Sequence, residues 1–289
     1  MQGLEDLEIG LMFWAGKDAH ATLAEVKQFG VRAGQIGFSG DLPLEGAAEQ
    51  WDEALKMEKF TVVTAFCSYV GEDYSDIPTV LRTVGLVPPN TRAERMARTK
   101  AVSDVAAKLG IDSVACHLGF IPHDTYAPLY AEMRDVALEL CHHCHKNGQF
   151  FTLETGQEPP KVLLQFLEDV HHPNLKINFD PANMILYGTG EPVEALDVLG
   201  KYVVSVHCKD GDWPPREHPA ALGEERPLGE GSVDFPAFIA KLKEIGYRGI
   251  LSVEREGDLS KGQRANDIRN AIRFLKSLRE NKAALEMNG

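Results

Sequence analysis

Short apolar runs rich in Val, Ile and Phe recur along the chain at intervals of roughly thirty to forty residues. Each run has the length of a β-strand and precedes a longer, more polar segment. The runs predicted as strands are residues 8–14, 33–38, 60–66, 113–119, 149–154, 175–180, 202–210 and 249–254. Runs of this kind are typical of parallel strands that helices cover. We therefore expect eight parallel strands that are mostly apolar on both faces.

The segments between the runs have the pattern of amphipathic helices. Apolar residues recur at three- and four-residue steps in residues 18–30, 92–110, 234–246 and 265–280. Several of these segments end at a glycine, which commonly follows the last turn of a helix. Eight strand–helix alternations without a Pro- or Ser-rich linker predict a single (β/α)8 barrel domain over residues 1–289. The alternative is a doubly wound open sheet, but no Gly-x-Gly-x-x-Gly motif follows the first run.

Residues 127–148, "APLYAEMRDVALELCHHCHKNG", include Cys141, Cys144 and His145 in the C-x-x-C-H spacing of c-type haem attachment. The same segment has apolar residues at helical steps, which predicts a helix whose buried face includes Cys144. Haem attachment also requires an oxidising compartment, and no export signal is visible. We therefore interpret the cysteines as packing residues and the histidines as residues of the helix end, where positive charge is favourable.

The composition indicates a protein with a sizeable core and an acidic surface. Hydrophobic residues make up 44% of the chain, charged residues make up 25%, and the formal net charge is −13. Proteins bind nucleic acids and anionic membranes mainly through Lys and Arg, so this charge disfavours both partners. We expect no nucleic-acid or membrane partner, and the composition leaves the oligomeric state open.

The N-terminal residues and the cysteines bear on the compartment. The stretch "MQGLEDLEIGLMFWAG" carries two Glu and one Asp where a signal peptide would carry positive charge. Five scattered cysteines, an odd number, do not resemble a disulfide framework. We expect a cytoplasmic protein with reduced thiols and no membrane span.

Ionisable residues stand at the carboxyl ends of the last four predicted strands. They are Glu154, Asp180, His207 and Glu254. In a barrel these strand ends meet at the mouth where active sites lie, and three carboxylates there would repel one another without a cation. One nitrogen and three oxygen donors suit Mn²⁺, Mg²⁺ or Co²⁺, with Zn²⁺ also possible. We predict that these four residues bind one divalent metal ion.

Lys209 is a further candidate at the same mouth. It follows His207 by two residues, so its side chain should point to the same side of the strand. There it would hold a hydroxyl or carboxylate of the substrate. The alternative is a structural ion pair with Asp210 or Asp212 from the following loop.

Aromatic residues close the first three predicted strands. Trp14, Phe38 and Phe66 would wall the apolar side of a sugar, or else pack beneath the loops. Two long irregular segments, residues 68–90 and 211–231, follow the third and seventh strands. Because βα-loops form the active face of a barrel, we expect these segments to shape the substrate pocket.

The chain contains five short sequence motifs, in this order: "LETGQE", "NFDPANMI", "SVHCKD", "PLGEGSVDF" and "SVERE". In order and spacing they resemble the sugar phosphate isomerase/epimerase superfamily, the xylose isomerase-like barrels that also include endonuclease IV. The similarity covers essentially the whole chain and is most specific from Glu154 onward. It implies a Glu/Asp/His/Glu metal site on the four residues above. In the ketose 3-epimerase branch it further implies that two Glu ligands, here Glu154 and Glu254, act as acid and base.

The resemblance also bears on residues around the metal. It implies that His117 contacts substrate oxygens and that Glu158 is a second acidic residue for substrate hydroxyls. The alternatives are a satisfied strand histidine and a residue of the first helical turn. Asn183 departs from the pattern, because endonuclease IV and many isomerases of the family carry histidine there. Asn183 retains the ability to hydrogen-bond to substrate, but the departure and the acidic charge argue against DNA repair.

This residue set predicts proton transfer at carbon. Removing a proton beside a carbonyl creates an enediolate, and a metal that binds the carbonyl and the neighbouring hydroxyl oxygen stabilises it. One Glu takes the proton and the other returns one, which gives an epimer or an aldose–ketose isomer. We predict a divalent-metal-dependent isomerase or epimerase of a small sugar or polyol-derived ketone.

Two other functions would use the same residues. A lyase or dehydratase would expel a β-hydroxyl from the same enolate, as inosose and dehydroshikimate dehydratases of this superfamily do. A non-catalytic barrel would keep the metal ligands for stability or ligand binding. No GxxxxGK[ST] loop is present, so a phosphorylated substrate is not supported and the identity of the substrate stays open.

Overall fold

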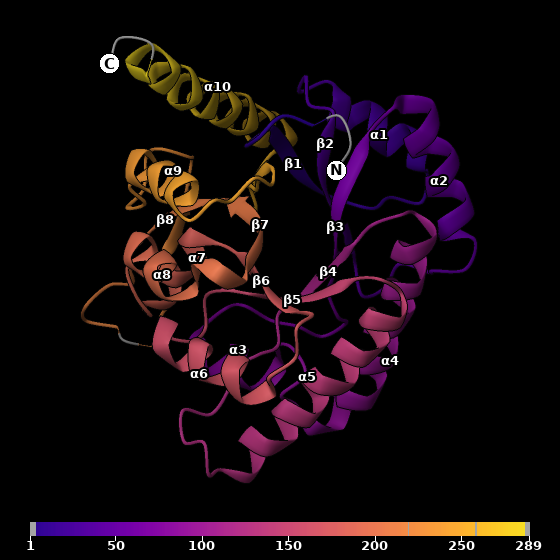
Figure 1. The fold of residues 1–289 in the computed structure, drawn as a ribbon, viewed down its shortest axis with the longest axis vertical. Coiled ribbons are helices and arrows are strands. Elements are labelled where there is room, and N and C mark those ends of the chain that lie inside the picture. Colours follow the sequence, from indigo (N-terminus) through magenta and orange to yellow (C-terminus); the bar gives the residue numbers. More distant parts are fainter. Residues whose placement is uncertain (1–3, 219, 258, 287–289) are drawn as a thin grey trace.

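The computed structural model describes residues 4–218, 220–257 and 259–286. Eight of the strands in these residues close into a parallel barrel in the order β1-β10-β7-β6-β5-β4-β3-β2. The strands are β1 (Ile9–Trp14), β2 (Ala33–Phe38), β3 (Thr61–Cys67), β4 (Ser113–Cys116), β5 (Phe150–Glu154), β6 (Leu175–Phe179), β7 (Val203–Cys208) and β10 (Leu251–Val253). Helices surround them (Figure 1). The predicted (β/α)8 barrel is confirmed, and the open sheet is wrong.

The helices follow the strands in the expected alternation. They are α1 (Ala19–Lys27), α2 (Ala47–Glu58), α3 (Ile77–Thr83), α4 (Pro89–Lys108), α5 (Pro128–Lys146), α6 (Pro160–Val170), α7 (Pro181–Tyr187), α8 (Pro192–Leu199), α9 (Phe235–Glu244) and α10 (Lys261–Glu286). Aspartates cap several of them, as Asp18 does by accepting the Ala21 backbone N–H. In the part of the chain that the structure describes, no helix is both long and apolar enough to cross a bilayer.

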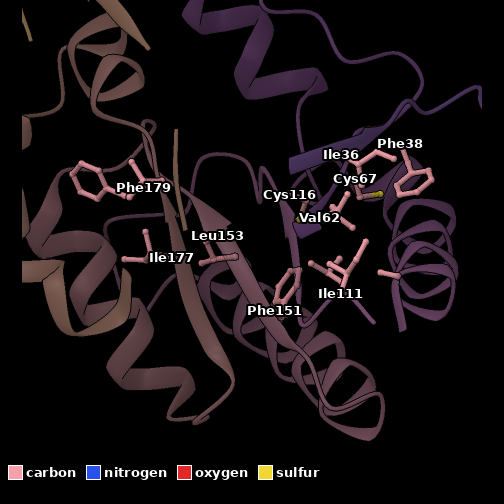
Figure 2. Packing of buried hydrophobic residues seen from close by; sticks show 14 of the residues in the cluster. Ile36, Phe38, Val62, Cys67, Ile111, Cys116, Phe151, Leu153, Ile177 and Phe179 are labelled. Carbon is pink, nitrogen blue, oxygen red and sulfur yellow. The ribbon is translucent and has the colours of Figure 1, made fainter. Parts of the chain in front are cut away.

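The two faces of the strands differ in polarity. Outward residues such as Phe38, Phe151 and Phe179 are apolar and belong to the main hydrophobic core (Figure 2). Buried polar residues alternate with them along the strands, because successive side chains point to opposite faces. They include Gln35, Thr64, Thr152, Asn178, Ser205, His207 and Ser252. The expectation of two apolar faces is therefore wrong for the interior, where polar side chains hydrogen-bond to one another across the barrel.

Helix α5 accounts for the C-x-x-C-H motif. The predicted helix is confirmed, and Cys141 and Cys144 are buried in the core as free thiols. His143 lies on the outside and contacts Asp104 through a 2.7 Å Nε2–Oδ1 contact. The motif thus divides into inward packing residues and outward polar residues, as the helical pattern predicts.

The two long segments predicted as irregular contain regular structure. Residues 68–90 include α3, and the segment after β7 forms an antiparallel pair, β8 (Asp210–Asp212) and β9 (Glu224–Arg226). The Asp210 carboxylate accepts backbone N–H groups of Gly229, Gly231 and Val233, which ties this segment to the end of β7. A Cβ at Gly231 would clash with that carboxylate. A side chain at Gly231 of "PLGEGSVDF" would therefore disturb the hydrogen bonds that Asp210 accepts from this segment.

Candidate metal and substrate site

Four ionisable side chains converge at the carboxyl ends of adjacent strands. Glu154, Asp180, His207 and Glu254 each offer one donor atom, and these atoms all lie within 4.8 Å of one another. His207 Nδ1 lies 3.0 Å from Glu154 Oε1, 3.2 Å from Glu254 Oε2 and 3.9 Å from Asp180 Oδ2. Asp180 and His207 are fully buried, and the two glutamates are nearly so. The four ionisable residues predicted from the carboxyl ends of the strands therefore lie together in the structure.

The hydrogen bonds of the carboxylates leave oxygens available for a cation. Asp180 Oδ1 accepts the Asn183 N–H and caps α7, while Glu154 Oε1 accepts the Asn183 side-chain Nδ2. Among the described residues, Glu154 Oε2 and Asp180 Oδ2 are buried without a hydrogen-bond partner, whereas Glu254 Oε2 faces His207 Nδ1 at 3.2 Å and Lys209 Nζ at 3.3 Å. Buried unpaired carboxylate oxygens are costly, and a cation bound among them would remove that cost. This cluster could bind a divalent metal.

The charges of the cluster shift the pKa values of its members. Burial favours the neutral imidazole, but Glu254 and Glu154 outweigh it and raise the pKa of His207 well above its usual value. Burial raises the pKa of Asp180 well above its usual value. Burial also disfavours the ionised form of Glu254, but the charges of His207 and Lys209 lower the pKa of Glu254 below its usual range. Glu254 therefore favours its ionised form, which positively charged neighbours stabilise.

A cavity of about 530 Å³ opens above the cluster and includes seven of the ten predicted site residues in its lining. These seven are Trp14, Phe66, His117, Glu154, Asn183, Lys209 and Glu254. The Phe66 ring packs against the rings of His117 and His207, and Trp14 packs edge-on against Phe66. His117 Nε2 lies 3.9 Å from Glu154 Oε2. The volume is in the range of small-molecule sites.

Lys209 lies in the cavity wall as predicted, but its partners differ from the expected ones. Its Nζ lies 3.3 Å from Glu254 Oε2 and forms an ion pair with Glu256. Asp210 and Asp212 instead bond within the β8–β9 segment. The expected alternative pairing with those aspartates is therefore wrong, and Lys209 holds Glu254 beside the cluster.

Besides the clustered Asp180 and His207, the predicted residues Glu158 and Phe38 lie outside the cavity lining. Glu158 is buried, its Oε1 accepts the Ile121 N–H at 2.8 Å, and burial raises the pKa of this carboxyl to about 8. Because α6 begins at Pro160, Glu158 is not a first-turn helix residue. Phe38 is fully buried in the outer core, so it does not wall the cavity.

The cavity lining also includes polar side chains that were not predicted as site residues. They include Tyr74, Tyr187, Glu225 and Glu256. Glu256 follows Glu254 by two residues, and the two-residue period that located Lys209 would also have found it. Tyr74 precedes α3 and Tyr187 ends α7, two short helices for which the sequence carries no clear signal.

The sequence of the chain also matches a known protein family. The profile of the family described as xylose isomerase-like TIM barrel matches residues 23–278. The chain belongs to this family. The resemblance noted in the sequence is therefore confirmed. A crystal structure of a xylose isomerase domain protein from Planctomyces limnophilus is 39% identical, with a TM-score of 0.90, and the match covers 96% of this chain and 99% of that chain.

Two curated relatives match parts of the chain. An uncharacterised protein of Methanocaldococcus jannaschii is 27% identical over 187 residues, which are 61% of this chain and 58% of the relative. The rhizopine catabolism protein MocC of Rhizobium meliloti is 31% identical over 140 residues, which are 45% of this chain and 40% of that protein. The chain thus spans about half the length of the curated relatives that it matches.

More distant solved structures share the fold. A D-tagatose 3-epimerase-like protein is 18% identical with a TM-score of 0.71, and covers 96% of this chain and 100% of its own. A Mycobacterium smegmatis barrel in complex with magnesium is 19% identical, with a TM-score of 0.66 and coverages of 90% and 88%. A probable 3-DHS dehydratase from Bacillus anthracis is 16% identical, with a TM-score of 0.65 and coverages of 93% and 99%. These three likenesses show the shared fold alone.

Proposed function

We propose that this chain is a divalent-metal-dependent isomerase or epimerase of a small sugar or polyol-derived ketone. The observation that carries the proposal is the buried cluster of three carboxylates and His207, in which Glu154 Oε2 and Asp180 Oδ2 have no hydrogen-bond partner among the described residues, next to a cavity of about 530 Å³. Three oxygens and one nitrogen favour Mn²⁺, Mg²⁺ or Co²⁺, with Zn²⁺ also suited to the set. The magnesium complex of a distant barrel supports this choice of ion.

The four clustered residues would hold the ion, and two of them would also move protons. When bound, the metal supplies the positive charge that stabilises a substrate oxygen as a proton leaves the adjacent carbon. Glu154 and Glu254 come from β5 and β10, which β6 and β7 separate, so they approach the cavity from different sides. One carboxylate takes the proton and the other returns one to the opposite face or to the neighbouring carbon.

The surrounding side chains support these two glutamates and the substrate. Asn183 donates to Glu154 Oε1, and Lys209 lies 3.3 Å from Glu254 Oε2, so each carboxylate has a fixed orientation. The rings of Trp14 and Phe66 offer an apolar wall for the carbon face of a sugar. The remaining polar group of that wall, His117, is placed to hydrogen-bond to substrate oxygens, since its Nδ1 has no partner among the described residues.

The experiment is turnover in deuterated water. The metal-loaded protein would be incubated with free ketoses, including D-fructose and D-allulose, the sugars in two of the distant solved complexes. We expect deuterium at one substrate carbon in step with product formation, measured by NMR, and none with Glu254→Gln. Product formed without deuterium at carbon would contradict the proton-transfer mechanism.

The second candidate is a metal-dependent lyase or dehydratase. Lys209 favours it, because an ammonium group in the cavity wall can protonate a departing hydroxyl. The barrel of a probable 3-DHS dehydratase supports the same assignment. A lyase or dehydratase reaction of this chain would give an unsaturated product that absorbs in the ultraviolet, whereas an epimer or isomer would not absorb there. Measuring absorbance alongside deuterium incorporation therefore separates the two reactions.

A further inference from the structure

A buried glutamine crosses the barrel interior to reach the metal cluster from below. Gln35 lies on β2 and is fully buried. In the closed barrel, three strands separate β2 from β6 in either direction, so the two strands are opposite each other. Gln35 Nε2 nevertheless donates to Asn178 Oδ1 on β6 at 3.2 Å. The side chain therefore spans the barrel and links its two halves.

The second hydrogen bond of Gln35 decides which way its amide faces. Gln35 Nε2 also lies 3.2 Å from the Val206 carbonyl oxygen. A backbone carbonyl only accepts hydrogen bonds, so the atom facing it must be the amide nitrogen. The Gln35 Oε1 atom then faces His207 Nε2 at 3.1 Å. Because an amide oxygen only accepts, His207 Nε2 must be the proton-bearing donor.

This arrangement determines which nitrogen of His207 can bind a metal. With a proton on Nε2, the nitrogen left with a free lone pair in the neutral ring is Nδ1. Nδ1 faces Glu154, Asp180 and Glu254. We infer that Gln35 is a positioning residue that holds His207 in the tautomer and ring orientation needed for metal binding through Nδ1. This inference rests on the metal site of the proposed function.

Asn178 favours the opposite tautomer and tests the inference from within the structure. Its Nδ2 lies 3.3 Å from His207 Nε2 and could donate to that atom if it were bare. A bare Nε2 would then face Gln35 Oε1 at 3.1 Å, with two acceptors in contact at a fully buried position. It would also place the only N–H proton of the neutral ring on Nδ1, the nitrogen that faces the carboxylates. The Gln35 hydrogen bond therefore prevails.

A matched pair of variants isolates this hydrogen bond. Gln35→Met keeps the length of the side chain and removes the acceptor. Thr64→Val is the control, because Thr64 pairs with Gln35 in the β2–β3 register, is fully buried and has no hydroxyl partner among the described residues. Zn²⁺ and Mn²⁺ affinities would be measured by competition with a chelating dye. We expect Gln35→Met to bind metal about 10- to 100-fold more weakly and Thr64→Val to bind within about twofold of wild type.

Two further readouts keep the test independent of activity and of the folding of one variant. Gln35→Glu retains an acceptor for His207, so it should bind metal more tightly than Gln35→Met. In wild type loaded with Zn²⁺, NMR of ¹⁵N-labelled histidine should place the remaining ring proton of His207 on Nε2. This measurement needs no substitution at Gln35.

The outcomes separate this inference from the metal site itself. Wild type that binds neither metal would overturn the proposed function and this inference together. Wild type that binds metal would overturn the inference alone if its NMR spectrum placed the His207 proton on Nδ1. A folded Gln35→Met that bound metal within twofold of wild type would do the same.

Discussion

The two halves of the barrel contribute different chemistry to one cavity. Strands β1, β3 and β4 end in an aromatic and imidazole wall, formed by Trp14, Phe66 and His117. Strands β5, β6, β7 and β10 end in the charged cluster, formed by Glu154, Asp180, His207, Lys209 and Glu254. Equivalent strand-end positions in one fold thus carry an apolar surface on one side and nearly all the charge on the other.

From this difference we expect metal binding and substrate selection to be separable by mutation. The charged residues depend on one another, since each pKa shift in the cluster comes from its neighbours or from burial. The wall residues make ring contacts that a different aromatic or aliphatic residue could replace. Gln35 is the exception, because it lies on β2 and acts on the opposite half. The predictions below test this division.

The largest effect should come from the charged half. Glu254→Gln keeps the shape of the side chain and removes a proton acceptor, so we expect kcat to fall about 10²- to 10⁴-fold in a folded protein. Glu256→Gln is the matched control, because Glu256 lines the same cavity but lies outside the cluster. It should lose much less activity. Equal kcat values for Glu254→Gln and wild type would show that Glu254 does not transfer the proton, and no turnover in either protein would support the non-catalytic barrel.

A smaller effect should come from the wall. Trp14 is 41% exposed and lines the cavity, so Trp14→Ala should raise KM about tenfold, with kcat and metal affinity nearly unchanged. Trp213→Ala is the control, since Trp213 is 38% exposed and lies outside the cavity lining. Steady-state kinetics and a metal titration check both variants. Loss of metal binding in Trp14→Ala would show that the two halves are not separable.

The effect expected to be smallest on turnover concerns stability, and it comes from a buried carboxyl of the charged half that lies outside the cluster. Burial raises the pKa of Glu158 from 4.5 to about 8, so the folded protein retains a proton that the unfolded chain loses. Stability should therefore fall as pH rises from about 5 to about 8. Glu158→Gln keeps an oxygen for the Ile121 N–H and should remove most of that fall, on the order of a few kcal/mol. Thermal unfolding at both pH values checks this, and parallel curves would contradict it.

Simple rules predicted the barrel and the charged half. In a (β/α)8 barrel the functional residues lie at the carboxyl ends of the strands, and this expectation identified the four clustered residues. The alternation in "SVHCKD" predicted that His207 and Lys209 lie on the inner side of β7. These rules work because they depend on strand position alone. They fail where a partner comes from elsewhere, as with the ion pair between Lys209 and Glu256.

The polar interior could not be predicted from the apolar runs. A run such as "AGQIGF" contains one polar residue, and its composition does not reveal that Gln35 faces inward. The contact between Gln35 and His207 joins residues 172 positions apart in the chain. The short helix α3 and the β8–β9 pair were missed because loop segments carry little periodicity, and hydrogen bonds such as those of Asp210 hold them in place.

The central claim is that the charged half binds one divalent metal, and metal content tests it most directly. Wild type and His207→Ala would be purified without chelators, checked for folding by circular dichroism and measured by mass spectrometry. The account predicts about one equivalent of divalent metal in wild type and little in the variant. Wild type without metal, whose melting temperature also fails to rise with Mn²⁺, Co²⁺, Mg²⁺ or Zn²⁺, would contradict it.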